Sequence, residues 1–248
     1  MIAIVLSLCG TLAAYYLFKA LYLRTGSLWF MPLVLCPIAI VALLLFAGVP
    51  YEEYRGGGSI LQWLLGPATV AFAVPLYRQQ NLIRKYLAEL SIVGIVAAIT
   101  AITTTMGIVH LFGVDESYVL SLAPRSITTP LAMNVSVMLG GNETITAVFV
   151  ILTGVIGMLM TVAIIRFLNI HNPLLKGLLF GFTAHGTGTA RAYEENEKAG
   201  VMASVAMIFM GVITALIAPF LVPLLLHIFY ILTGASRFFI SASTSYFI

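Results

Sequence analysis

Charge is scarce in this chain. Only 8% of its 248 residues are Asp, Glu, Lys or Arg, whereas about 25% of the residues in an average soluble domain are charged. A compact water-soluble domain of this length needs a polar surface that this composition does not supply. Hydrophobic residues make up 61% of the chain and its mean hydropathy is +1.07, which excludes an intrinsically disordered protein. The composition therefore predicts an all-α membrane protein.

Groups of residues that carry enzyme chemistry are also missing. Cys9 and Cys36 lie inside apolar runs without the spacing of metal ligands, so we interpret both as small buried hydrophobic residues. No paired carboxylates, HExxH motif or Cys/His arrangement lies within an apolar stretch. The net charge of +3 is spread over single or paired basic residues, which argues against a nucleic-acid surface. We expect no enzyme, cofactor, metal or nucleic-acid partner.

Long uncharged runs give the number of membrane spans. A spanning helix needs about 20 mostly apolar residues. Stretches of 18 residues or more without Asp, Glu, Lys or Arg cover 1–18, 25–51, 56–77, 90–114, 144–165 and 199–236. The sequence therefore predicts about six transmembrane helices.

The charges between these spans predict the orientation of the chain. Three alternate loops hold seven basic residues, namely Lys19, Arg24, Arg78, Arg84, Lys85, Arg166 and Lys176, and Glu89 lies at the start of the helix that follows the second of these loops. The other loops hold five acidic residues and one basic residue, namely Glu52, Glu53, Arg55, Asp115, Glu116 and Glu143. Because Lys and Arg are retained on the cytoplasmic side, we expect the N-terminus outside the cytoplasm.

Two further apolar segments are unsuited to a lipid-facing helix. The segment 117–141 contains Pro124, Arg125 and Pro130, and the segment 177–192 is short and rich in glycine. Irregular backbone at membrane depth is tolerated only when it is buried in protein or lines a watery cavity. We predict that both are re-entrant or broken-helix hairpins, since acidic loops on both sides require the first segment to return to the side it left. Two ordinary but polar spans are the alternative.

The two segments also resemble each other. Residues 123–130 align with residues 184–191 at an offset of 61, and both contain the pattern Ala-x-x-(Ser/Thr)-x-Thr. The same offset superimposes the span 90–114 on the span 144–165, which runs in the opposite direction. Similar segments that enter from opposite faces indicate an inverted-topology repeat.

The chemistry of these segments predicts an anion site. Arg125 and Arg191 are the only arginines within them, and a guanidinium binds a carboxylate through two parallel hydrogen bonds. An arginine inside a membrane is costly and usually functional. The alternative is that each arginine extends to the membrane surface, and that Arg191 pairs with one of the glutamates that follow it.

Polar neighbours extend this predicted site. We expect hydroxyl groups beside the arginines to bind hydroxyl or carbonyl oxygens of a ligand, and His185 to donate to an anion, to carry a proton or simply to pack between helices. The candidate substrate-binding residues are Arg125, Ser126, Thr128, Thr129, Asn134, His185, Thr187, Thr189 and Arg191.

Both segments carry motifs of a known family. The run Ser-Leu-Ala-Pro-Arg-Ser-Ile-Thr-Thr-Pro at 121–130, followed by Gly140-Gly141, resembles the first signature of the LrgB/CidB family, and the run at 181–191 resembles the second. The resemblance covers about residues 1–231. It implies a multi-pass protein of the bacterial inner membrane that works beside a small LrgA/CidA-like membrane protein. The family was named for antiholin-like control of murein hydrolases, and it also includes glycolate/glycerate translocators of plastids and proteins linked to pyruvate uptake.

These observations leave two functional hypotheses. The first is a secondary transporter of small monocarboxylates of the pyruvate, glycolate or glycerate class, coupled to a proton or sodium ion, with elevator-like alternating access. The second is a holin-like or antiholin-like regulator of murein hydrolase activity and lysis that acts by forming homo-oligomers and altering membrane permeability. In both, residues 1–231 form one membrane domain, with scaffold helices in 1–58 and a core in 59–231. Residues 232–248 form a tail outside the resemblance, either a natural extension or an engineered addition.

Overall fold

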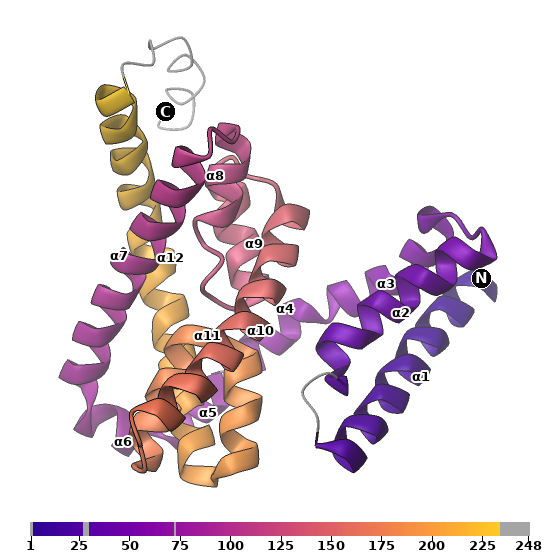
Figure 1. Cartoon of the computed structure of the whole chain (residues 1–248), viewed down its shortest axis with the longest axis horizontal. Coiled ribbons are helices and arrows are strands. Elements are labelled where there is room, and N and C mark those ends of the chain that lie inside the picture. The colour runs from indigo at the N-terminus through magenta and orange to yellow at the C-terminus, as the bar shows by residue number, and fades with distance from the viewer. Residues whose placement is uncertain (1, 27–29, 72, 234–248) are drawn as a thin grey trace. The chain divides into compact units, whose positions relative to one another are not determined.

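The computed structural model describes residues 2–26, 30–71 and 73–233, and all regular secondary structure in these ranges is helical (Figure 1). The predicted all-α fold is therefore confirmed. Most of the predicted tail, from residue 234 onward, lies outside the described residues. The chain divides into two compact units, residues 1–74 and 75–248, and each is described here by itself.

The first unit contains α1 (Ile2–Thr25), α2 (Pro32–Ala47), α3 (Tyr51–Trp63) and α4 (Leu65–Ala71). Helix α2 begins with a proline, which has no N–H to leave unsatisfied, and ends at Gly48 with a positive φ of 63°. Helix α3 packs closely on α1 at Gly57, where a methyl group would lie 2.6 Å from the Ile4 carbonyl oxygen. The contact between α1 and α3 therefore depends on a residue without a side chain.

The predicted span at 56–77 is not one continuous helix. It is divided among α3, α4 and α5 (Ala73–Arg78). Helix α3 ends at Trp63 and α4 begins at Leu65, so Pro67 lies in the first turn of a helix, where a proline ring causes no clash and no hydrogen bond is lost. This proline is therefore compatible with a helix start but not with the middle of a single span.

The second unit contains α6 (Gln80–Lys85), α7 (Leu87–Leu111), α8 (Glu116–Leu122), α9 (Thr129–Met138), α10 (Glu143–Phe167), α11 (Pro173–Glu195) and α12 (Glu197–Thr233). Helix α12 runs beside α7 and also contacts α9 and α11 (Figure 1). At one end of this unit the Tyr230 hydroxyl donates to Glu116 Oε2 at 2.6 Å, which joins the end of α12 to the start of α8.

Within the described residues, four helices are long and apolar enough to cross a membrane: Ile4–Thr25, Leu87–Leu111, Glu143–Phe167 and Glu197–Ile231. Helix α2 is also apolar but has only 16 residues. These helices agree with a membrane protein. They do not by themselves give the predicted total of six spans.

Small residues bring α11 and α12 together. A methyl group on Gly181 would lie 2.7 Å from the Ala206 Cβ atom and would contact the Ala203 carbonyl oxygen, and Gly177 meets the backbone of Ala199 in the same way. Lipid tails are as apolar as the helices, so helix association in a membrane depends on such close packing rather than on a hydrophobic driving force. This interface therefore positions α11 against the longest helix of the unit.

We expect the substitution Gly181→Ala to destabilise the protein by about 1–3 kcal/mol, because the added methyl group forces α11 away from α12. Thermal unfolding of the purified protein in detergent measures the effect. Gly186→Ala in the same helix is the matched control, since a methyl group there meets nothing within 4 Å. Equal loss of stability in both variants would contradict the packing argument.

Candidate functional site

Residues 116–138 form the first hairpin. Its arms α8 and α9 are joined by a non-helical stretch at 123–128. The Asn142 backbone N–H donates to Ser121 Oγ at 2.7 Å, and the Thr146 hydroxyl lies 2.7 Å from Ser136 Oγ and 2.8 Å from the Ser121 carbonyl oxygen. These bonds hold the end of α8 beside the residues that follow α9. The predicted break at 117–141 is therefore confirmed.

Residues 173–195, all of α11, form the second hairpin. The backbone bends at His185, whose φ of 37° and ψ of −121° are non-helical. Lys176 Nζ lies 3.2 Å from Glu195 Oε2, although 19 residues separate them and a straight helix would place them about 28 Å apart. Gly188 also lies against the Phe180 carbonyl. The predicted break at 177–192 is confirmed, and His185 forms its tip.

Arg125 lies at the tip of the first hairpin and joins two long helices. Its Nε donates to Thr105 Oγ1 on α7 at 3.0 Å, and its Nη1 donates to Thr153 Oγ1 on α10 at 3.0 Å. Among the described residues, no carboxylate pairs with Arg125 and no hydrogen-bond partner is present for its Nη2. Two neutral hydroxyls do not compensate a partly buried charge, so the arrangement favours an anionic ligand.

The second hairpin contacts α10 at Gly154, the residue that follows Thr153. A methyl group on Gly154 would lie 2.7 Å from His185 Cε1 and 2.8 Å from Thr187 Oγ1. Thr153 and Gly154 are consecutive, so the tips of both hairpins contact the same part of α10. The structure thus places Arg125, His185 and Thr187 against two consecutive residues of α10.

His185 has two unusual features at this contact. Its side chain is 6% exposed, and its Nε2 atom has no hydrogen-bond partner among the described residues. A positive φ is rare for a non-glycine residue and often marks a functional position. The imidazole nitrogen is therefore buried at the tip of the second hairpin without a partner among the described residues.

The other predicted residues occupy several environments. Ser126 is buried at the first tip, while Thr128 and Thr129 are half-buried where α9 begins. Asn134 is exposed further along α9. Thr189 is buried and its hydroxyl donates to the His185 carbonyl at 2.8 Å, so its hydroxyl supports the bend of the second hairpin.

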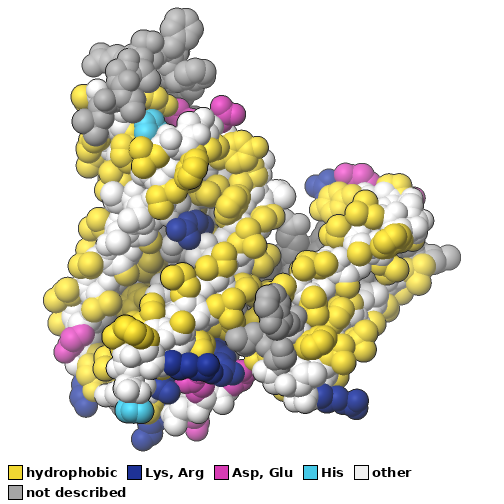
Figure 2. Space-filling model, viewed as in Figure 1, with side chains coloured by type: hydrophobic (Ala, Val, Ile, Leu, Met, Phe, Trp, Pro, Cys, Tyr) yellow, Lys and Arg dark blue, Asp and Glu magenta, His cyan; other side chains and the backbone are white. Residues whose placement is uncertain are grey.

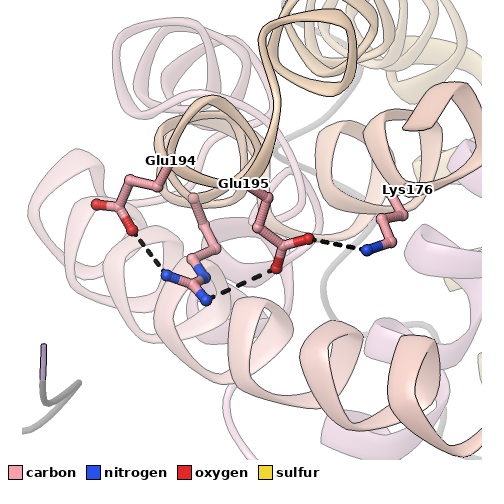
Figure 3. Close-up of polar contacts among 4 residues, drawn as sticks. Lys176, Glu194 and Glu195 are labelled. Carbon is pink, nitrogen blue, oxygen red and sulfur yellow. Dashed lines mark hydrogen bonds and ion pairs between the residues drawn. The ribbon is translucent and has the colours of Figure 1, made fainter. Parts of the chain in front are cut away.

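Arg191 lies in an ion-pair cluster at the base of the second hairpin. Its Nη1 is 2.8 Å from Glu194 Oε2 and its Nη2 is 3.7 Å from Glu195 Oε1. Glu195 also pairs with Lys176, and Figure 3 shows the side chains of Lys176, Glu194 and Glu195 in this cluster. The structure therefore shows the alternative arrangement for Arg191, in which it pairs with nearby glutamates and does not join the tip of its hairpin.

The surface of the second unit shows the same contrast between charged residues at the ends of the helices and charged residues midway along them. Figure 2 shows acidic and basic side chains mainly toward the ends of the unit, and a basic patch midway among hydrophobic side chains. Charges at the ends of a membrane protein are hydrated, whereas a charge midway along the helices is not. The charge midway along the helices is therefore the one that needs a functional explanation.

Three residues at the site were missed by the sequence analysis. Thr105, Thr153 and Gly154 lie on α7 and α10, outside the two irregular segments. Polar residues within apolar spans are a recognisable signal, but threonine also bonds its own helix, so that signal is weak. Only the fold shows which threonines face the arginine.

The sequence matches the LrgB-like family over residues 11–224. The chain belongs to this family. It is 42% identical over 217 residues to the uncharacterized protein YwbG of Bacillus subtilis, covering 88% of this chain and 96% of that protein. It is 34% identical to the holin-like protein CidB of Staphylococcus epidermidis, covering 91% and 97%, and 33% identical to the antiholin-like protein LrgB of Bacillus subtilis, covering 87% and 94%. No solved structure matches this member of the LrgB-like family.

We expect the substitution Thr105→Val to destabilise the protein by about 1–3 kcal/mol, because it removes an acceptor from a partly buried guanidinium. Thermal unfolding in detergent measures the change. Thr104→Val is the matched control, since the neighbouring Thr104 hydroxyl is exposed and bonds only its own helix, at Thr100 and Ala101. If both variants unfold at the same temperature, Arg125 does not depend on Thr105.

Proposed function

We propose that this LrgB-like protein is a secondary transporter of small monocarboxylates of the pyruvate, glycolate or glycerate class. The observation that carries the proposal is Arg125, held by two neutral hydroxyls among apolar helices with no carboxylate partner in the described part of the chain. An arginine in such a place is costly unless it binds an anion. A carboxylate on the remaining donors of the guanidinium would compensate its charge.

The second hairpin supports the same proposal. His185 Nε2 and the Thr187 hydroxyl lie against Gly154, next to the residue that Arg125 contacts. They would bind the other oxygens of the substrate or, in the case of His185, the coupled proton. Sodium is the other candidate for the coupling ion. Irregular backbone at the tips of two hairpins is typical of transporter binding sites.

The buried positions of α7 and α10 support an inverted repeat. Both helices have 25 residues, and five of the six buried residues of each correspond at a separation of 56 residues, which differs from the offset of 61 that aligns residues 123–130 with residues 184–191. The corresponding pairs are Leu90 and Thr146, Gly94 and Val150, Ala98 and Gly154, Ile102 and Met158, and Thr105 and Thr161. Thr105 contacts the first hairpin at Arg125, and Thr161 contacts the second hairpin at Thr183. We propose six spans with the N-terminus outside, which gives these two halves opposite orientations.

The test is uptake of labelled pyruvate, glycolate and glycerate into liposomes that contain the purified protein. We expect saturable uptake and at least a tenfold loss in Arg125→Ala, because the substrate carboxylate would lose its charged partner. Arg125→Lys should also lose most activity, since an ammonium lacks the planar fork. Arg166→Ala, at the exposed end of α10, is the control. Wild-type uptake by Arg125→Ala would exclude Arg125 as the binding group.

The names of the relatives favour a second function. They are called holin-like and antiholin-like, and these names support a regulator of murein hydrolases and lysis more directly than they support transport. Such a protein would form homo-oligomers or bind a small LrgA/CidA-like membrane protein and change membrane permeability. The contacts it needs are small-residue helix faces rather than a buried arginine.

Dye release from liposomes separates the two functions. A holin-like regulator should release a trapped dye without saturation, and Arg125→Ala should release it as fast as the wild type, because no substrate site takes part. A transporter should leave the dye inside while it takes up carboxylate. Release that requires the purified small partner would support the regulator.

A further inference from the structure

The first unit contains an apolar groove that is separate from the hairpins. It lies between α1, α2 and α3 and has a volume of about 480 Å³. Its walls run from Leu6 to Phe18 on α1 and include Ala39 and Leu44 on α2. The Thr11 hydroxyl on this wall is bonded to the Ser7 carbonyl at 2.7 Å and to the Tyr54 hydroxyl at 2.9 Å, so the groove presents mainly hydrocarbon.

The length of the groove matches one leaflet of a bilayer. The twelve residue steps from Leu6 to Phe18 correspond to about 18 Å of helix. The hydrocarbon core of a bilayer is about 30 Å thick, so one leaflet contributes about 15 Å. The length of the groove therefore fits one acyl chain of a lipid.

One end of the groove carries a carboxylate. Glu53 lines it near the Leu6 end, because Gly56 and Gly57 in the same helix lie against Ile4 and Ser7. The neighbouring Glu52 pairs with Arg55 at 3.5 Å, whereas Glu53 has no ion pair among the described residues. A carboxylate at the mouth of an apolar groove is complementary to an amphiphile with a positively charged head.

We propose that this groove binds one acyl chain of a phospholipid whose headgroup carries a primary ammonium, with the ammonium at Glu53. The proposal concerns only the first unit and does not depend on the function assigned to the hairpins. A lipid in the groove would fill the space between three helices that bury few side chains of their own. It would therefore stabilise the packing of α1, α2 and α3.

Native mass spectrometry of the retained lipid tests the proposal. The full chain is first incorporated into vesicles of equal phosphatidylethanolamine and phosphatidylglycerol and is then released in mild detergent. We expect at least threefold enrichment of phosphatidylethanolamine on the wild type. Gly10→Leu should lose the bound lipid, because Gly10 lines the groove and its side-chain direction is open. Gly66→Leu, also at an open position but outside the lining, should keep it.

The carboxylate is tested by a second matched pair. Glu53→Gln should keep the bound lipid but lose the headgroup preference, and Glu52→Gln should keep both. Equal retention of the two lipids by the wild type, or the same result for both glutamate variants, would overturn the proposal. A change from dimer to monomer in Gly10→Leu without loss of lipid would show that a second copy of the chain occupies the groove instead.

Discussion

The two hydrogen bonds of the Arg125 guanidinium fix the tip of the first hairpin within the second unit of this LrgB-like protein. They join the tip of the first hairpin to α7 through Thr105 and to α10 through Thr153. A charged donor bonded to hydroxyls away from water gains more from each bond than a neutral donor does. The same bonds leave the positive charge itself uncompensated by any described residue. The tip is therefore fixed in position while the arginine keeps the capacity to bind an anion.

The second hairpin reaches the same place by a different kind of packing. Its tip fits against α10 because Gly154 and Gly157 have no side chains, and a methyl group on Gly157 would lie 2.6 Å from the Thr183 carbonyl oxygen. Its base is closed by the ion pair of Lys176 with Glu195, both of which are partly exposed to solvent. Solvent-exposed ion pairs contribute little to stability. The glycines, rather than the charges at the base, therefore determine where this tip lies.

Sequence reasoning predicted some of the residues that the structure brings to the candidate site, for a physical reason that can be stated. Arg125 and His185 were predicted because charge and glycine-rich irregularity are conspicuous in an apolar chain. Thr105 and Thr153 were not found, because a threonine that bonds its own helix and one that faces an arginine are alike in sequence. Arg191 was predicted beside the site from its position in the repeat, but the glutamates one turn away are its partners. The repeat was recognised from the spacing of residues along the sequence. This spacing does not show which ion pairs form when the hairpin folds.

The two units also differ in what stabilises them. In the second unit, close contacts between small residues on α11 and α12 provide packing that a membrane protein cannot obtain from the hydrophobic effect. In the first unit, close approach is confined mainly to the glycines of α3 against the start of α1, and among its described side chains only Tyr22, Met31 and Cys36 are buried hydrophobic residues. Helices that bury so little of one another gain much of their contact from what surrounds them. The arrangement of the first unit should therefore depend on the lipid proposed for its groove, whereas the hairpin site should depend on contacts within the chain.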